Sequence, residues 1–587
     1  MRELRFFITQ VFTFSYFCGK IATGGFASCK TKNQVQITIS QAVKKENDMK
    51  SKDSAEMKTK LIPYILFPML IGVLTGILIF LFKIGASSVM HWSERIYTFA
   101  RQNPRYLPLL IVGATVLGIV SALILTFAKE CRGGGIPTAV ASIRGLIPMK
   151  WGQGIFALYA SALLTYLVGV PLGNEGPSVQ MGAAVGKGSS KLSGKNKLAW
   201  ERYFMTGGAC SGFAIVTGAP LSGIMFALEE AHRRFSTTLF AVASVSVLFG
   251  TVTYRYLAFF FRVDTAFLDL DISEVLPMKY LWSAILIGAL CGICSLLLTK
   301  SYRIARKISK TKAGKMPFIV KFMLIFAVTA ILGFFSANFI GTGHSLIEEI
   351  LHGEIVWYTV LLIFFVRAVL TVYANHEGVS GGVFVPTLAF GAMIASIVAK
   401  MLISLKLVES QYYVILIIVG MASFLSASSR TPITAIAFSA EALCGAGNII
   451  PVVFGVVISY IIAEVSGDTS FTDTVIEYRT EAAQRGKTAV VVNSHLRVRK
   501  GSFADGMEIR DILWPPTCAV LSVDRKSSRF FHRSLYEIRG GDLIHLHYQT
   551  YDPEQTKEML IAILGNQPDD KYAHTHPGDD DHIIPSD

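Results

Sequence analysis

Long stretches without Lys, Arg, Asp or Glu recur between residues 61 and 463, and they limit the folds open to this chain. The clearest are Leu61–Phe82, Leu107–Ala128, Gly152–Asn174, Tyr203–Leu228, Leu281–Thr299, Phe322–Gly341 and Gln411–Ser429. A bilayer core of about 30 Å needs about 20 apolar residues per spanning helix. Backbone groups in lipid must pair internally, and these runs lack the alternation of barrel strands. We therefore expect an all-α polytopic membrane protein.

The composition excludes a soluble globular protein and nucleic-acid binding. Of the 587 residues, 52% are hydrophobic and only 16% charged, which is too apolar for a soluble chain of this size. The net charge of +14 is concentrated in short clusters between apolar runs, at Lys187–Arg202, Arg233–Arg234, Lys300–Lys315 and Arg479–Lys500. Such clusters mark cytoplasmic loops, and no aromatic stripe accompanies them as in nucleic-acid binders. We expect a multi-pass protein of the cell (plasma or inner) membrane, with lipid as its surroundings.

Changes in composition divide the chain into parts. Short β-rich runs appear only near the C-terminus, at Ala489–Asn493, Ala519–Val523 and Leu543–His547, separated by Gly and Pro. They predict a small α/β domain, which the neighbouring basic clusters place in the cytoplasm. The predicted parts are an N-terminal extension (1–57), a membrane transport domain (58–481), a C-terminal domain (487–565) and a disordered acidic tail (566–587).

The N-terminal extension has three interpretations. Residues 1–57 carry a basic polar tract without buried periodicity, which is typical of disorder. The second interpretation is a misassigned start, with Met49 or Met57 as the true one. The third is a signal peptide, indicated by the short apolar run Phe6–Phe17 and the small residues after it.

Two pairs of similar segments reveal an internal repeat. Gly176–Ala183 matches Val385–Ala392 at an offset of 209 residues, and Pro220–Glu229 matches Pro432–Glu441 at an offset of 212. Two unrelated motifs at nearly one offset indicate a duplication of about 210 residues. Transporters commonly contain such repeats, with substrate sites at the repeat interface formed by broken helices. The residues alone leave the relative orientation of the halves open.

Three glycine–proline segments are candidate helix N-termini inside the membrane. They are Gly133–Pro137, Gly173–Pro177 and Gly381–Pro386. Proline is favoured in a first helical turn, and glycine lets backbone approach a ligand closely. A helix N-terminus offers unpaired N–H groups and about half a positive charge, which suits an anion. The alternative is a set of kinks that only pack helices.

Glutamates at two places are candidate proton carriers. Glu175 lies within the second segment, and an ionisable group inside a membrane is costly and usually functional. Its carboxylate could occupy the anion site when ionised and leave it when protonated. Glu229 and Glu230 end an apolar run before Arg233. A helix-end ion pair is the expected role of Glu229, whereas Glu230 is either that or a proton port.

Neither an enzyme nor a metal protein is expected. No nucleophile–base arrangement or metal-binding cluster lies in the apolar runs, and Cys291 and Cys294 are expected to serve close helix packing. Lys187 follows a glycine run, but the spacing of a phosphate loop is missed. We therefore predict no cofactor and no resident metal.

The ordered segments GGGIP, GNEGP and GGVFVP within a duplicated membrane domain closely resemble the CLC family of chloride channels and transporters. The resemblance covers about 400 residues and implies a homodimer built from inverted repeats. It implies that Glu175 is the external gating glutamate and Glu230 the internal proton glutamate, which is typical of antiporters. It also implies that backbone N–H groups of Val383 and Phe384 bind the anion, so the chain is expected to exchange chloride for protons.

This sequence departs from the family pattern at three positions. Gly134 replaces the central serine, Asn174 replaces the arginine before the gating glutamate, and Thr472 stands where the pore tyrosine is expected. Asn174 resembles the fluoride-exporting branch, so a fluoride/proton antiporter and a gated passive anion channel remain alternatives. The predicted anion-binding residues are Gly134, Gly135, Ile136, Gly176, Val383, Phe384 and Thr472.

The segment from Lys487 to Gly565 resembles the small C-terminal domain of potassium-channel regulatory modules, the TrkA-C type. Some proteins with this module bind small ligands there. The resemblance therefore implies a regulatory domain with an unidentified small ligand.

Overall fold

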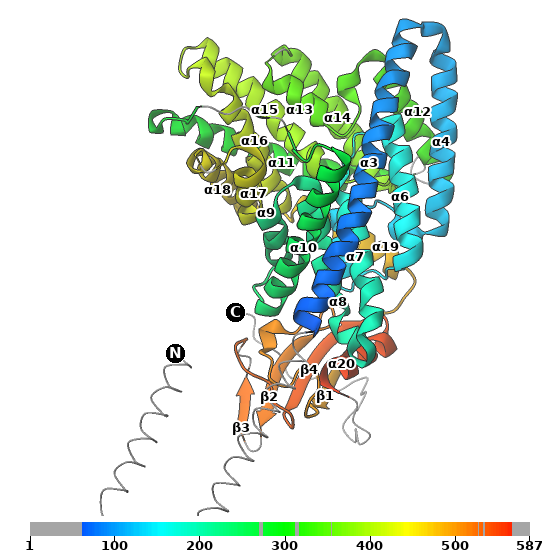
Figure 1. Ribbon diagram of the computed structural model, residues 1–587, viewed down its shortest axis with the longest axis vertical. Coiled ribbons are helices and arrows are strands. Elements are labelled where there is room, and N and C mark those ends of the chain that lie inside the picture. The colour runs from blue at the N-terminus through cyan, green and yellow to red at the C-terminus, as the bar shows by residue number, and fades with distance from the viewer. Residues whose placement is uncertain are drawn as a thin grey trace, which may run out of the picture. The chain divides into compact units, whose positions relative to one another are not determined.

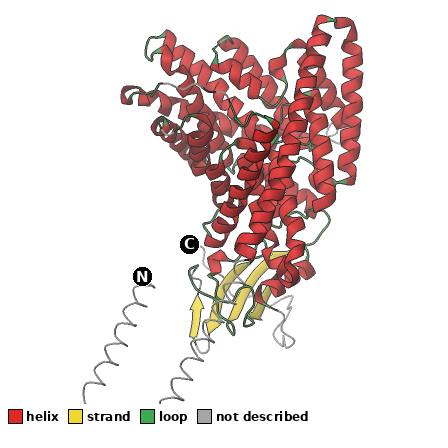
Figure 2. Cartoon of the chain, viewed as in Figure 1, coloured by secondary structure: helices red, strands yellow, loops and turns green. Residues whose placement is uncertain are grey.

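The computed structural model describes residues 62–565, apart from 269, 271–273, 312–315, 354, 446, 526–527 and 532–533. The described chain is helical up to residue 484, and its strands come together in one sheet after it (Figure 2). Among the described residues, nine helices are long and apolar enough to cross a membrane. The predicted polytopic helical fold is confirmed. The predictions for 1–57 and 566–587 lie outside the described residues.

The helices fall into two successive sets (Figure 1). The first set is α3 (Phe67–Gln102), α4 (Leu107–Phe127), α5 (Ile136–Ile143), α6 (Trp151–Val168), α7 (Glu175–Ser190), α8 (Lys197–Thr217), α9 (Pro220–Phe226) and α10 (Thr237–Phe261). The second set is α11 (Leu281–Ser309), α12 (Phe318–Phe335), α13 (His344–Leu351), α14 (Trp357–Glu377), α15 (Phe384–Ser404), α16 (Tyr413–Ser429), α17 (Pro432–Phe438), α18 (Ile449–Val465) and α19 (Phe471–Gln484).

Two apolar runs end or break earlier than their composition indicates. The run Tyr203–Leu228 is divided between α8 and α9, because Gly218 adopts a positive φ of 70° and Pro220 then starts a new helix. Within the run Gly152–Asn174, helix α6 ends at Val168, because Gly169 adopts the left-handed conformation that favours glycine. Both breaks come from single residues rather than from a loss of hydropathy.

The helices α9 and α17 show that the repeat is inverted. Each continues into one π-helical turn, Ala227–Ala231 after α9 and Ser439–Leu443 after α17. Glu229 in the first turn accepts hydrogen bonds from the backbone N–H groups that begin α17, and Glu441 in the second does the same for α9. The end of each helix therefore meets the start of the other, so the equivalent helices are antiparallel.

Glycine contacts repeat in the same way. A Cβ at Gly182 of α7 would collide with the carbonyl of Gly208 in α8, and a Cβ at Gly391 of α15 would collide with that of Gly420 in α16. Such backbone approach is typical of membrane helix packing. The Cys291 thiol donates to the Gly420 carbonyl at 3.6 Å and is not in a disulfide, as expected for a packing residue.

The described C-terminal strands form one antiparallel sheet in the order β1-β4-β2-β3. The strands are β1 (Val490–Arg497), β2 (Ala519–Arg525), β3 (Ser528–Phe531) and β4 (Leu543–Thr550), and α20 (Pro553–Leu564) follows them. In β4 every second residue is buried, including Ile544, Leu546 and Tyr548. All three predicted β-rich runs are strands. The sheet has its own hydrophobic core, to which α20 contributes Leu560.

Candidate functional site

The three glycine segments meet in space. Gly173 and Gly382 exchange backbone hydrogen bonds at 2.7 Å in both directions, so the two halves of the repeat join here. The first segment joins the third, because Gly381 N–H donates to the Gly134 carbonyl at 3.1 Å. Gly133 N–H donates to the carbonyl of Gly378, just before the third segment, at 2.7 Å. Segments that lie more than 200 residues apart in sequence therefore form one backbone junction.

Glycine is required at the centre of this junction. A Cβ at Gly176 would lie 2.6 Å from the Cα of Gly135 and 2.7 Å from the Cα of Gly382. Real side chains do not tolerate such distances from backbone, so a larger residue would force the segments apart. The predicted anion-binding residues Gly134, Gly135, Ile136, Gly176, Val383 and Phe384 all lie in the three segments that form this junction or in the helix turns that follow them.

Three helices start at the junction without a side-chain cap. Gly135, Asn174 and Val383 precede α5, α7 and α15, and none of the three has a side chain that accepts a hydrogen bond from the first turn. Uncapped N-terminal N–H groups carry a partial positive charge and bind anions readily. The arrangement has the chemistry of an anion site made from backbone.

Glu175 is the first residue of α7, and its side chain lies at the junction. It is completely buried, and neither carboxylate oxygen has a hydrogen-bond partner among the described residues. The backbone N–H of Val385 lies near the carboxylate, outside hydrogen-bonding geometry. Burying a carboxylate without partners is costly. Its position between α7 and α15 is one that a free anion could take in its place.

Glu230 lies in the π-helical turn after α9 and is buried. Thr472, at the start of α19, donates its hydroxyl to Glu230 Oε1 at 3.2 Å. The Arg144 guanidinium binds the main chain, donating to the carbonyls of Glu230 and Ala231 at 2.8 Å each. No Lys or Arg side chain of the described residues forms an ion pair with the Glu230 carboxylate. The Glu230 carboxylate is therefore not part of a helix-end ion pair within the described residues.

Two neighbouring residues have partners that the sequence did not predict. Glu229 makes no ion pair with Arg233 but receives the N–H groups of Ile433 and Thr434 at 2.9 and 2.7 Å. The N-terminus of a helix carries a partial positive charge and attracts a carboxylate. The start of α17 therefore takes the place of the arginine as the partner of Glu229. Thr472, predicted to bind the anion, donates its hydroxyl to Glu230.

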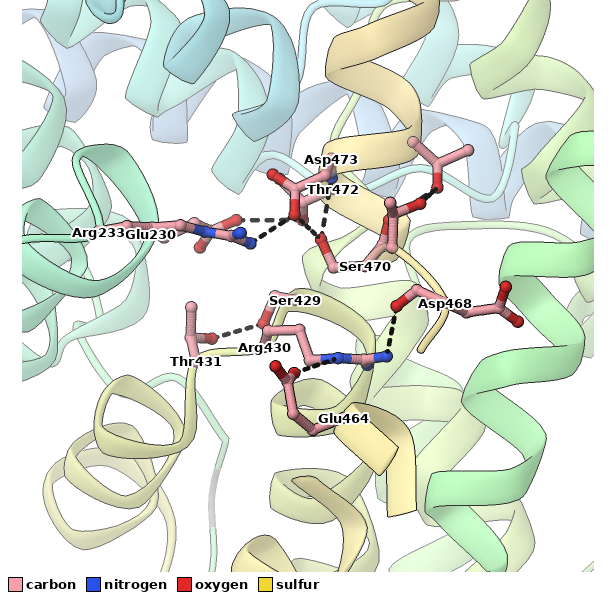
Figure 3. A network of polar contacts seen from close by, with 12 residues as sticks. Glu230, Arg233, Ser429, Arg430, Thr431, Glu464, Asp468, Ser470, Thr472 and Asp473 are labelled. Atoms are coloured by element: carbon pink, nitrogen blue, oxygen red, sulfur yellow. Dashed lines mark hydrogen bonds and ion pairs between the residues drawn. The ribbon is translucent and has the colours of Figure 1, made fainter. Parts of the chain in front are cut away.

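A polar network that the sequence analysis missed lies beside Glu230 (Figure 3). Asp473 forms an ion pair with Arg233 at 2.5 Å and lies 3.7 Å from Arg144. The Ser470 hydroxyl accepts from the Asp473 N–H at 3.0 Å and donates to Asp473 Oδ2 at 2.7 Å. The S-x-x-D spacing is a helix-start signature and could have found this pair. Asp473 and Arg233 line an open cavity of about 670 Å³. Glu229, the residue before Glu230, lines the same cavity.

The C-terminal segment Ile509–Trp514 contacts helices α8 and α10 of the membrane domain. The Tyr203 hydroxyl of α8 donates to the Asp511 carbonyl at 2.5 Å and accepts from Leu513 N–H at 2.9 Å. The Asp511 carboxylate accepts from Thr237 N–H and Thr237 Oγ1–H at 2.9 Å, which caps α10. Arg202 links this segment to α5 by donating to both Ile143 and Trp514 carbonyls.

Comparison with known proteins agrees with this architecture. The family model described as "Voltage gated chloride channel" matches residues 116–464. The H(+)/Cl(-) exchange transporter ClcA of Vibrio vulnificus strain YJ016 is 25% identical over 410 residues, covering 68% of this chain and 86% of the relative. That of Yersinia pseudotuberculosis serotype IB (strain PB1/+) is 26% identical over 446 residues, covering 74% and 91%.

Solved structures show the same fold. A slow cyanobacterial Cl-/H+ antiporter superposes with a TM-score of 0.66 at 22% identity, covering 72% of this chain and 99% of that one. A CLC-type fluoride/proton antiporter superposes with a TM-score of 0.58 at 20% identity, covering 69% and 96%.

Proposed function

This chain belongs to the voltage-gated chloride channel family, and from that premise we propose that it is a secondary active transporter exchanging chloride for protons across the cell membrane. The observation that carries the proposal is the buried Glu175 carboxylate, which has no hydrogen-bond partner among the described residues and lies where α7 and α15 begin. The relatives named as H(+)/Cl(-) exchange transporters support the same activity.

The exchange follows from competition for one place. When Glu175 is ionised, its carboxylate is the anion that the helix N-termini attract. Protonation removes the charge, so the attraction is lost and the side chain can leave. A chloride ion can then bind the free N–H groups, for which we propose Gly134, Gly135, Ile136, Gly176, Val383 and Phe384. Each cycle therefore couples a bound proton to a moved anion.

Glu230 is proposed to supply protons from the cytoplasmic side. It is buried, the preceding Glu229 lines an open cavity, and no cation of the described residues forms an ion pair with the Glu230 carboxylate. Burial disfavours the charged form of an acid, so a carboxyl group here is suited to taking up and releasing a proton. Thr472 then serves as a positioning residue, since its hydroxyl fixes the Glu230 carboxylate.

A fluoride/proton antiporter is the second candidate function. Asn174 precedes Glu175, and Gly134 offers no hydroxyl donor to the anion. Compared with the serine and arginine of the family pattern, these two residues offer fewer side-chain donors to an anion at the junction. This favours a small anion that is bound by backbone N–H groups. One of the similar solved structures is described as a fluoride/proton antiporter.

The C-terminal segment 487–565 is proposed to be a cytoplasmic regulatory domain of the TrkA-C type that binds a small ligand. Support comes from Asp511 and Tyr203, whose hydrogen bonds join this segment to α8 and α10. Because α10 begins at Thr237, shortly after the π-helical turn that holds Glu230, movement of the segment would reach the proton port. The homodimer implied by the family is part of the same proposal, and cross-linking of the purified protein tests it.

Simultaneous flux measurement tests the function. The full chain is reconstituted in liposomes, and anion efflux and proton uptake are recorded together for chloride, fluoride, bromide and nitrate. We expect a chloride gradient to drive protons uphill. Chloride flux without proton movement would identify a passive channel, and strong preference for fluoride would identify the second candidate.

A further inference from the structure

A group of polar side chains, two of them buried and one partly buried, lies beside the glycine junction and is not used by the proposed cycle. It consists of Tyr302 from α11, His376 at the end of α14, and Arg479 from α19. The Tyr302 and His376 rings lie 5.3 Å apart, and the His376 ring stacks on Tyr478 at 4.6 Å. Three helices therefore bring these side chains to one place.

Several hydrogen-bonding atoms in this group are unsatisfied. The Tyr302 hydroxyl, both ring nitrogens of His376 and the Arg479 Nε are buried without a hydrogen-bond partner among the described residues. A buried donor left unpaired costs about 1–3 kcal/mol, so each of these atoms needs an explanation. Tyr302 and His376 are almost fully buried, at 0% and 1% exposure. Their free N–H and O–H groups are suited to an anion.

The group contacts the anion junction directly. The Arg479 guanidinium lies so close to Gly133 that a Cβ there would collide with it, and it lies 3.4 Å from the Cβ position of Gly378. Arg479 Nη2 also donates to the Asn375 carbonyl at 2.5 Å. Gly133 begins the first glycine segment and Gly378 lies just before the third, so a full positive charge lies where these segments start.

This positive charge has no carboxylate partner in the described part of the chain. Arg479 forms no ion pair there, and the nearby Arg132 stacks on the Phe318 ring at 3.8 Å and donates to the Leu125 carbonyl. Arg132 and Arg479 are both partly buried, and two like charges this close repel each other, which an anion bound between them would relieve.

The acid beside His376 is already occupied by a lysine. Glu377 Oε1 lies 3.4 Å from His376 Nδ1, and Glu377 Oε2 is bound by Lys321 at 2.8 Å. Glu377 is therefore paired with Lys321, and it forms no ion pair with Arg479.

A basic cavity leads toward the group. A cavity of about 650 Å³ is lined by Arg306, Ser309, Lys310, Lys321, Tyr478, Glu481, Ala482 and Arg485. Tyr478 is shared, since its ring lines the cavity and stacks on His376. Clefts lined mainly by one sign of charge concentrate the opposite ion. The cavity is at the basic end of α11, which marks the cytoplasmic side.

We propose that Arg479, Tyr302 and His376 determine anion affinity and selectivity, by binding the anion as it passes between the basic cavity and the glycine segments. The proposal rests on the proposed transport function. Arg479 supplies the charge, and Tyr302 and His376 supply side-chain donors that Gly134 and Thr472 do not. The Phe471 ring, next to Thr472, packs on the Tyr302 ring at 5.4 Å, which places Tyr302 close to the start of α19.

Three substitutions in the full chain separate charge from structure. Arg479→Gln keeps an amide that can donate to the Asn375 carbonyl but removes the charge, whereas Arg479→Lys keeps the charge. Tyr302→Phe removes only the hydroxyl. Arg303→Gln is the matched control, because it removes a charge from α11, the helix that carries Tyr302, at a position that does not line the basic cavity and is already paired with Asp468.

Chloride binding by calorimetry and chloride flux in liposomes are the two measurements. Arg479 contributes both a positive charge and hydrogen-bond donors to the bound chloride, so we expect Arg479→Gln to weaken chloride binding about tenfold or more. Tyr302 contributes one hydroxyl donor without a charge, so we expect Tyr302→Phe to weaken chloride binding about threefold. Arg479→Lys and Arg303→Gln should stay within about twofold of the unsubstituted protein. All variants should elute as the same species in detergent.

Equal chloride affinity in Arg479→Gln and Arg303→Gln would overturn the inference, as would a loss of binding in Arg479→Lys as large as in Arg479→Gln. The failure of the proposed function looks different. In that case the unsubstituted protein shows no chloride-driven proton movement, while calorimetry still reports whether Arg479 binds the anion.

Discussion

Some glutamates of the first half of the membrane domain have a glutamate at the equivalent position of the second half, and others do not. Glu229 of the first half corresponds to Glu441 of the second, and each caps the helix that carries the other. Glu175 corresponds by the same offsets to Phe384, and Glu230 to Ala442. The acids present in both halves bind backbone N–H groups, whereas Glu175 and Glu230, present in one half, are buried with few or no partners among the described residues.

This difference separates two kinds of residue. A duplicated acid does the same structural task twice, since both halves need the ends of α9 and α17 joined. An acid found in only one half breaks the symmetry of the site, so it can act from one side of the membrane. Proton exchange needs such asymmetry, because the proton must enter and leave by different ends of one path.

Among the substitutions that test the difference between duplicated and unique acids, one that removes the titratable group of Glu230 is expected to have the largest effect. Glu230→Gln keeps the size of the side chain and can still accept from Thr472 Oγ1. We expect anion flux to continue while proton movement per anion falls at least about tenfold, because an essential proton carrier is lost. Parallel recording of both fluxes measures this. Unchanged coupling would return Glu230 to a purely structural role.

The duplicated acids are expected to affect folding instead. Glu229→Ala removes the acceptor for two N–H groups of α17 and for the Thr434 hydroxyl, so we expect a loss of about 1–2 kcal/mol in stability. Thermal unfolding in detergent measures it. Glu441→Ala is the matched variant and should act in the same direction, more weakly because Glu441 is exposed.

Coupling should survive in both of these variants. A protein that unfolds normally but exchanges chloride without protons after Glu229→Ala would contradict the division between duplicated and unique acids.

Gly134 tests the contribution of backbone to selectivity. A Cβ at Gly134 would collide with the Leu158 side chain, so Gly134→Ser alone is expected to lower stability. With Leu158→Ala making room, the added hydroxyl should raise preference for chloride over nitrate by up to about tenfold. Flux across a halide and nitrate series measures it, with Leu158→Ala as the control. An unchanged series would show that the anion does not contact Gly134.

Asp511 should have the smallest effect, since it lies outside the duplicated part and caps α10 from the C-terminal segment. Asp511→Asn keeps one acceptor and should cost about 0.5–1 kcal/mol of stability, while exchange changes less than about twofold. Thermal unfolding and flux of the full chain measure these. A complete loss of exchange would mean that this segment is part of the transport machinery.

Much of the fold was predictable because membrane helices and repeats leave strong patterns. The apolar runs predicted helices, and the nearly equal offsets of 209 and 212 residues predicted the duplication that α9 and α17 display. The break at Gly218 was missed, because hydropathy does not change where a glycine with positive φ ends a helix. Three of the strands were predicted from the sequence, and β3 was missed. That strand is only four residues long and carries no alternating pattern that could be recognised.

The site was predictable only where backbone makes it. Glycine before proline marks a helix start, so the three segments could be found from sequence, and their meeting confirms that they belong together. Side-chain partners depend on how distant helices pack. Neither the reach of Thr472 to Glu230 nor the gathering of Tyr302, His376 and Arg479 follows from any local pattern.

The central claim is that the unpartnered Glu175 carboxylate and the transported anion compete for one place. The most direct test is Glu175→Gln in liposomes, with chloride efflux and proton uptake recorded on the same sample. A neutral side chain cannot compete as an anion or carry the proton, so we predict that chloride flux persists and chloride-driven proton uptake disappears. Proton uptake that continues at the rate of the unsubstituted protein would contradict the claim.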